Sequence, residues 1–269
     1  MNKAIPLDAG RIRDHLPDGI PFGPILIRKS LPSTNTSLLE GARRGEYAPG
    51  TVIAAEEQTA GRGRMDRTWI TPPGQALAFS LLIANPVPAE PGLLSVGAAL
   101  AVAEAIEERT GLTPTVKWPN DVCLNRRKTA GILAEAFQKE GEHFAVVGIG
   151  INANAAPAVP GRHEGMRATS LAAEGGGTTD RSLLLAAFLA RFHEILLPLR
   201  SRDGSGIVEG LRRRSLLVGC EARFSRSNRV YSGRVAGHSE DLGIILDTAE
   251  GRITLPGAGT DLLDFRMRP

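Results

Sequence analysis

Apolar residues follow two patterns along the first four-fifths of the chain: helical spacing in some segments and compact runs in others. Apolar residues at helical spacing predict long core helices over residues 93–109 and 183–199. A shorter helix is expected between Ser33 and Gly45, because hydroxyl and amide side chains precede its apolar stripe and Arg and Gly residues close it. Compact apolar runs between turn residues predict strands at 51–55, 76–83, 132–137 and 143–147. This part of the chain therefore combines helices and strands.

The pattern changes after the three arginines at 212–214. Short strands separated by turn residues are expected at 221–224, 230–235, 243–247 and 252–255. Their spacing predicts a small barrel-like β module of about 50 residues. We expect a domain boundary near residue 214.

Composition narrows the class of protein. The chain has 269 residues, of which 42% are hydrophobic and 23% charged, as in a globular protein of one large domain or a large and a small one. The net charge of +3 is too small to indicate a protein that coats DNA. Two distant cysteines offer no disulfide framework, and neither an apolar leader nor an uninterrupted apolar span is visible. We expect a cytoplasmic protein with no membrane partner.

The loop after the strand at 51–55 carries the first candidate chemistry. Arg62, Arg64 and Arg67 lie within six residues, with Gly61 before them, Gly63 between the first two and Trp69 behind. Glycine lets backbone N–H groups approach an anion, and a guanidinium binds phosphate or carboxylate with a planar fork. An exposed basic turn or a nucleic-acid contact explains the loop equally well on this pattern alone.

Two further clusters contain rare lysines, since only five of the 32 Lys and Arg residues are Lys. Residues 117–121 join Lys117, Asn120 and Asp121 around a Trp-Pro pair; Asn can bind a base edge, and Asp can hold Mg²⁺ or receive an amine. Lys128 opens an apolar strand, where a compact ammonium suits a reacting oxygen. A strand-end turn and a surface lysine remain the plain alternatives.

A fourth cluster, residues 148–153, formally matches the dinucleotide fingerprint GxGxxA. That fingerprint requires a helix to begin at once, but Asn154, Pro157 and Pro160 follow. We reject a dinucleotide fold and expect the two glycines to let a ligand approach the backbone.

Together with Ser33-Thr34-Asn35, these four ordered motifs resemble the biotin protein ligases over about residues 25–265. The resemblance implies an N-terminal arm (1–24), a catalytic domain (25–214) and a C-terminal SH3-like β-barrel (215–269). The catalytic domain would be α/β, with a mixed sheet and helices mainly on one face. Too few residues precede Ser33 for the DNA-binding domain of some members, so we expect the monofunctional form. Asp66 departs from the family, where glycine is frequent.

The resemblance also implies an activity: ATP and Mg²⁺ activate biotin as biotinyl-5′-AMP, and biotin passes to a lysine of a biotin carboxyl carrier protein. The implied catalytic residues are Lys128, Arg64, Asp121 and Lys117, with Asp121 also the candidate Mg²⁺ ligand. The implied biotin-binding residues are Ser33, Thr34, Asn35, Gln58, Arg62, Gly63, Arg64, Lys128, Gly131 and Gly150. The implied nucleotide-binding residues are Arg67, Trp69, Asn120, Lys128 and Asn152. DNA is not an expected partner, and a monomer and a homodimer both remain open.

Two alternatives remain. A lipoate ligase would use the same acyl-adenylate chemistry on a related fold, although the residues at 61–64 and 117–121 favour biotin. A nucleic-acid-binding module would use the arginine loop and the small barrel. The low net charge and the few aromatic residues after residue 214 weigh against it.

Overall fold

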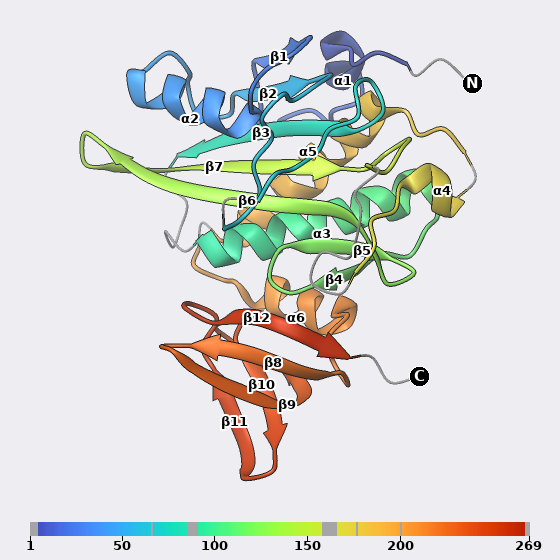
Figure 1. The fold of residues 1–269 in the computed structure, drawn as a ribbon. Coiled ribbons are helices and arrows are strands. Elements are labelled where there is room, and N and C mark those ends of the chain that lie inside the picture. The colour runs from blue at the N-terminus through green and yellow to red at the C-terminus, as the bar shows by residue number, and fades with distance from the viewer. Residues whose placement is uncertain are drawn as a thin grey trace.

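A seven-stranded sheet forms the centre of the larger domain (Figure 1). The computed structural model describes residues 5–65, 67–84, 91–157, 166–175, 177–199 and 201–266. The strands of this sheet are β1 (Ile25–Arg28), β2 (Val52–Ala55), β3 (Leu77–Ala84), β4 (Thr115–Lys117), β5 (Asp121–Leu124), β6 (Arg127–Lys139) and β7 (Glu142–Ile151). Their order is β1-β2-β3-β7-β6-β5-β4, and only the β1–β2 pair is parallel. The predicted mixed sheet is confirmed.

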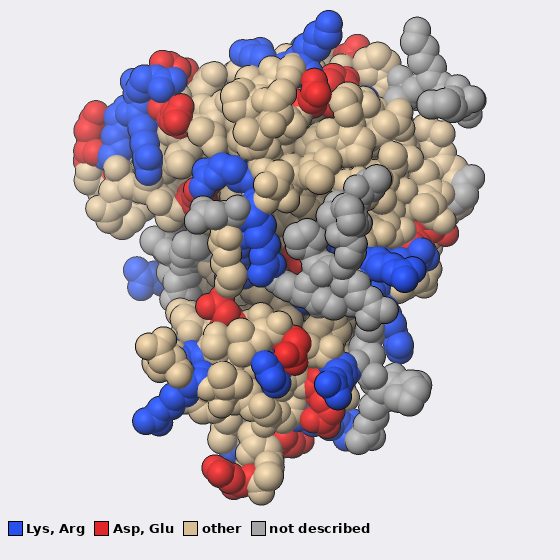
Figure 2. All heavy atoms as spheres, viewed as in Figure 1, with Lys and Arg blue, Asp and Glu red and all other residues tan. Residues whose placement is uncertain are grey.

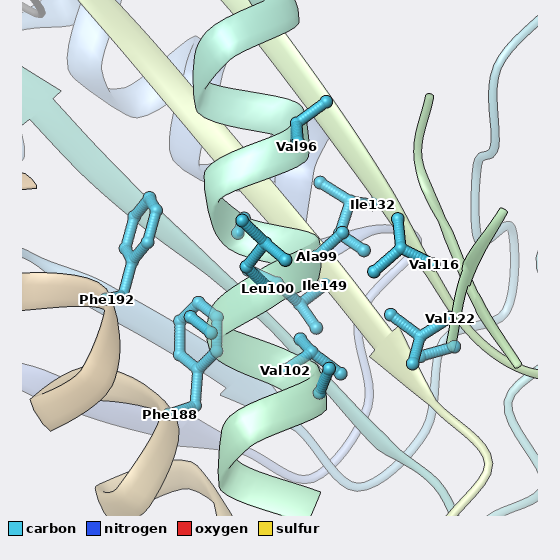
Figure 3. Packing of buried hydrophobic residues seen from close by; sticks show 14 of the residues in the cluster. Val96, Ala99, Leu100, Val102, Val116, Val122, Ile132, Ile149, Phe188 and Phe192 are labelled. Carbon is cyan, nitrogen blue, oxygen red and sulfur yellow. The ribbon is translucent and has the colours of Figure 1, made fainter. Parts of the chain in front are cut away.

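Helices cover both faces of this sheet, but unequally. The helices are α1 (Ala9–Asp14), α2 (Thr34–Arg44), α3 (Pro91–Thr110), α4 (Leu171–Gly175), α5 (Arg181–Leu199) and α6 (Ser205–Arg214). Side chains alternate along a strand, so Val147 and Ile149 enter the main core under α3, while Val146 packs in a separate cluster under α2. Figure 3 shows Ile149 on one side of α3 and Phe188 of α5 on the other. Gly148 lies on the α2 face, which is the face that carries the candidate site.

The first motif residues begin α2 as predicted. Ser33 is the N-cap and its hydroxyl accepts the Thr36 N–H at 3.4 Å. Gly45 closes the helix in the left-handed conformation, with φ 80°. The cap places Thr34 and Asn35 in the first turn, both buried, so local sequence fixes where these polar side chains stand.

Helix α5 is long and apolar enough, by composition, to cross a membrane, but half of that stretch is buried within the protein. Phe188 meets Phe79 of the sheet edge-to-face at 4.9 Å. It is a core helix, as its predicted amphipathic pattern indicated.

The C-terminal module is a five-stranded antiparallel sheet that fits an SH3-like domain. Its strands are β8 (Glu221–Arg226), β9 (Arg229–His238), β10 (Ile244–Thr248), β11 (Gly251–Leu255) and β12 (Asp261–Arg266), in the order β11-β10-β9-β8-β12. The sequence predicted the first four strands and missed β12 and helix α6. Because α6 ends at Arg214, we propose the division of the chain at that residue.

Residues of both domains meet around Trp118. Its indole N–H donates to the Leu242 carbonyl at 2.8 Å, and its ring meets Phe224 edge-to-face at 6.2 Å. Nearby, the buried His238 shares a 2.8 Å hydrogen bond with Ser215 through Nε2. The 117–121 motif is therefore anchored to the C-terminal module.

Acid is expected to weaken the fold through His238. Burial lowers the pKa of His238 to about 4 from its ordinary 6.5. Between these values the unfolded chain binds more protons than the folded one, so stability is lost as pH falls from 6.5 towards 4, by about 3 kcal/mol. Urea unfolding between pH 4.5 and 7.5 measures this slope. His238→Gln should flatten the slope, and an unchanged slope in that variant would contradict the assignment.

Candidate functional site

A cavity of about 440 Å³ opens between the α2 face of the sheet and the C-terminal module. It is lined by every residue that the sequence analysis assigned to a site: Ser33, Thr34, Asn35, Gln58, Arg62, Gly63, Arg64, Arg67, Trp69, Lys117, Asn120, Asp121, Lys128, Gly131, Gly150 and Asn152. Figure 2 shows Lys and Arg atoms running down the middle of this face, from the larger domain towards the smaller one. The structure thus brings the separate motifs into one space, while the role of each residue stays a prediction.

Two glycines form a flat floor in this cavity. Gly131 of β6 and Gly150 of β7 lie directly opposite each other in the sheet. A Cβ atom at Gly150 would come within 3.0 Å of the Trp69 indole, and one at Gly131 would come within 3.1 Å of it. The glycines therefore let the indole lie against the backbone. Strand β7 ends at Ile151 and residues 152–157 are irregular, so the rejection of a dinucleotide fold is confirmed.

Gly150→Ala is expected to displace Trp69, because the added methyl group overlaps the indole. The indole ring lies against the strand backbone and cannot give way without moving the arginine loop. A shift in tryptophan emission and weaker ligand binding should follow. Gly237→Ala in β9 is an informative comparison, since a Cβ at that glycine meets nothing within 4 Å and its backbone is not in the left-handed region. Unchanged emission in a folded Gly150→Ala protein would contradict this packing.

The arginine loop folds back on itself. The Gly63 N–H donates to the Arg67 carbonyl at 2.7 Å, and the Trp69 N–H donates to the Gly61 carbonyl at 2.8 Å. A Cβ at Gly61 would collide with the Trp69 carbonyl, which explains that glycine. This hairpin-like geometry holds Arg62 and Arg64 at the cavity. Asp66 lies outside the described residues, as do residues 158–165, which follow the fourth cluster.

Two lysines share one carboxylate at the sheet edge. Lys117 Nζ lies 3.2 Å from Asp121 Oδ2, and Lys128 Nζ lies 2.6 Å from Asp121 Oδ1. The Lys117 and Asp121 side chains are 4% and 7% exposed, whereas Lys128 is 29% exposed. Lys128 also lies over the Trp69 ring, 5.6 Å from its centroid. The triad therefore carries a net positive charge, and Lys128 is its accessible member.

The opposite end of the cavity, at the start of α2, is lined by uncharged polar side chains and by Arg62, whose charge is paired with Glu135. Gln58 Oε1 accepts from the Thr34 N–H at 2.8 Å and from its hydroxyl at 3.1 Å. Ser80 donates to Asn35 at 2.8 Å, and Asn35 donates to Glu135 at 2.6 Å. These contacts tie the start of α2 to the loop and to the sheet.

Two carboxamides flank the cationic end. Asn120 Nδ2 donates to the Ile132 carbonyl at 3.0 Å and its Oδ1 accepts from Arg64 at 3.2 Å. Asn152 is 1% exposed and donates to the Thr169 carbonyl at 3.0 Å. Within the described part of the chain its buried Oδ1 has no partner, so it offers an acceptor for a ligand N–H or O–H.

Sequence analysis missed several supporting residues. Glu135 of β6, which the sequence analysis gave no role, contacts Arg62 at 3.1 Å and also accepts a hydrogen bond from Asn35. Asp261 and Leu262 of β12 line the cavity from the C-terminal module. No local pattern marks these two residues, because only the packing of the two domains brings them to the site.

Comparison with known proteins extends this picture. The model of the Biotin/lipoate A/B protein ligase family matches residues 27–152. The chain is 31% identical to the biotin--[acetyl-CoA-carboxylase] ligase of Mycobacterium tuberculosis, over 97% of each chain. It is 33% identical to the bifunctional ligase/repressor BirA of Bacillus subtilis over 75% of this chain, and spans 63% of that protein's length. Among solved structures, the biotin protein ligase of Aquifex aeolicus in complex with biotin and ATP has a TM-score of 0.75 at 30% identity, covering 90% of this chain and 99% of that one.

Proposed function

This chain belongs to the biotin protein ligases, and from that premise we propose that it activates biotin with ATP and transfers it to a lysine of a biotin carboxyl carrier protein. It is thus an enzyme that forms an amide bond. The observation that carries the proposal is the meeting of Arg64, Lys117 and Lys128 at one end of a cavity whose other end offers uncharged polar groups. The expected cytoplasmic location stays a prediction.

The first step joins two anions. An oxygen of the biotin carboxylate attacks the α-phosphorus of ATP, the bond from that phosphorus to the bridging oxygen breaks, and pyrophosphate leaves. Cations must offset the repulsion and stabilise the charge that develops. Lys128 is the exposed member of its triad, so we assign it to the reacting oxygens; the buried Lys117 holds Asp121 against it.

In the second step the carrier lysine amine attacks the carbonyl carbon of the mixed anhydride. An amide bond forms, the bond to the phosphate oxygen breaks, and AMP leaves with that electron pair while the amine loses a proton. Asp121 is the carboxylate of the triad, and we assign it to orienting the Lys128 ammonium. Its expected contact with the incoming amine stays a prediction.

Asp121 is a poor candidate for a resident Mg²⁺ ligand. Both of its oxygens face ammonium groups, at 3.2 and 2.6 Å, and a divalent cation there would repel them. Across the described ranges no group of three or more His, Cys, Asp or Glu side chains could hold a metal ion. We therefore propose that Mg²⁺ arrives on the phosphates of ATP, as part of the substrate.

The end of the cavity at the start of α2 suits biotin. The ureido ring of biotin offers N–H donors and a carbonyl acceptor, which match the side chains of Thr34, Asn35 and Gln58. At the cationic end, the indole of Trp69 and the guanidinium of Arg67 offer planar faces for adenine.

Pyrophosphate exchange into ATP tests the proposal. Exchange should require biotin and should not occur with lipoate, which separates this function from the lipoate ligase of the same family. An isolated carrier domain should then receive one biotin on its lysine. Exchange with lipoate and not with biotin would make lipoate the substrate in place of biotin. Exchange with neither would refute the proposal that the protein activates a carboxylic acid with ATP.

A further inference from the structure

The C-terminal module reaches into the site through one ion pair. Arg64 Nη2 lies 3.3 Å from Asp261 Oδ1 at the start of β12, while Arg64 Nη1 donates to Asn120 Oδ1 at 3.2 Å. Figure 1 shows β12 on the side of its sheet that faces the larger domain. Three segments remote in sequence therefore meet at one guanidinium.

This arrangement orients Arg64 and leaves it able to bind a ligand. A guanidinium has five N–H donors, and within the described residues these two contacts use two of them. A planar group held at both terminal nitrogens loses freedom before any ligand arrives. Arg64 is 37% exposed and lines the cavity, so donors remain for an anion.

We propose that Asp261 is a positioning residue: it holds the Arg64 guanidinium in the plane that binds the acyl-adenylate, so that β12 prolongs retention of the intermediate. This inference rests on the proposed function. Loss of Asp261 frees Arg64 to rotate away, and the adenylate then leaves faster.

The exposure of Asp261 limits how much its loss can change the rate of adenylate release. Asp261 is 41% exposed, and an exposed ion pair contributes up to about 1 kcal/mol, which corresponds to about a fivefold change in a rate. Loss of a negative charge beside an anion site acts in the opposite direction, by reducing repulsion. Asp261→Asn separates the two effects, because its amide oxygen still accepts a hydrogen bond but carries no charge.

The same strand provides a matched control. Asp264 of β12 pairs with Arg223 of the neighbouring strand at 3.1 Å, and both side chains are more than half exposed. It does not line the cavity. Asp264→Ala removes an equivalent charge and ion pair from the same sheet without touching Arg64.

The experiment measures release of preformed, radiolabelled biotinyl-5′-AMP in a chase with unlabelled compound. Asp261→Ala should release it about three- to fivefold faster, while Asp261→Asn and Asp264→Ala should stay near the wild-type rate. Asp261→Ser provides a second truncation, and circular dichroism checks that each variant is folded. In an Arg64→Ala background, Asp261→Ala should cause no further change in the release rate. This double-mutant cycle tests whether Asp261 acts through Arg64.

Slower release in both Asp261→Ala and Asp261→Asn would overturn the proposal, since Asp261 would then act as a repelling charge. An Asp261→Ala effect that persists in the Arg64→Ala background would overturn it as well. Failure of the proposed function is distinguishable, because the wild-type protein would then show no biotin-dependent pyrophosphate exchange.

Discussion

Lys128→Ala is expected to reduce biotin-dependent pyrophosphate exchange at least a hundredfold. An ammonium that stabilises charge developing on the reacting oxygens acts mainly in the transition state, and its loss costs about 3 kcal/mol or more. Initial rates of exchange at saturating biotin and ATP measure the effect. Lys128→Gln should be nearly as damaging, because it keeps length and polarity but not charge.

The fold should survive this substitution. Asp121 keeps the Lys117 ammonium at 3.2 Å, so the buried carboxylate is not left without a counter-charge. Lys139→Ala at the far end of the same strand is the matched control and should exchange at the wild-type rate. Near wild-type exchange in a folded Lys128→Ala protein would remove this residue from the catalytic step.

Arg64→Gly is expected to activate biotin but to lose the adenylate into solution. Charge-assisted hydrogen bonds are worth about 1.5–3 kcal/mol, which corresponds to about ten- to a hundredfold faster release if the loss falls on the off-rate. The structure adds that Arg64 ties the loop to Asn120 and Asp261, so the variant also loses these two contacts. Free biotinyl-5′-AMP acylates any accessible amine.

A streptavidin blot of serum albumin incubated with enzyme, biotin and MgATP measures the leak. Strong labelling is expected with Arg64→Gly and weak labelling with the wild-type protein. Arg64→Lys keeps the charge but not the fork, and should give intermediate labelling if geometry matters. A variant that makes adenylate and labels albumin no more than wild type does would show that Arg64 does not retain the intermediate.

Short-range chemistry accounts for most of what the sequence alone determined. The cap and closing glycine of α2 depend on neighbouring residues, and so do the strands predicted from compact apolar runs. Every residue that the family motifs named lines the cavity. Local pattern is sufficient there because each of these features is settled within a few residues.

Only the tertiary structure decided how those residues act together. Gly131 and Gly150 become a floor because β6 and β7 pair in that register, which no spacing along the chain reveals. Asp121 is shared by two lysines because β4, β5 and β6 are neighbours, and this sharing is the ground for our proposal that Mg²⁺ arrives with ATP. The sequence analysis missed helix α6 and edge strand β12, which are only 10 and 6 residues long. The contact of Asp261 with Arg64 joins residues 197 positions apart and exists only because the two domains pack together. The residues next to a charged side chain in the sequence do not indicate which distant charge it will contact.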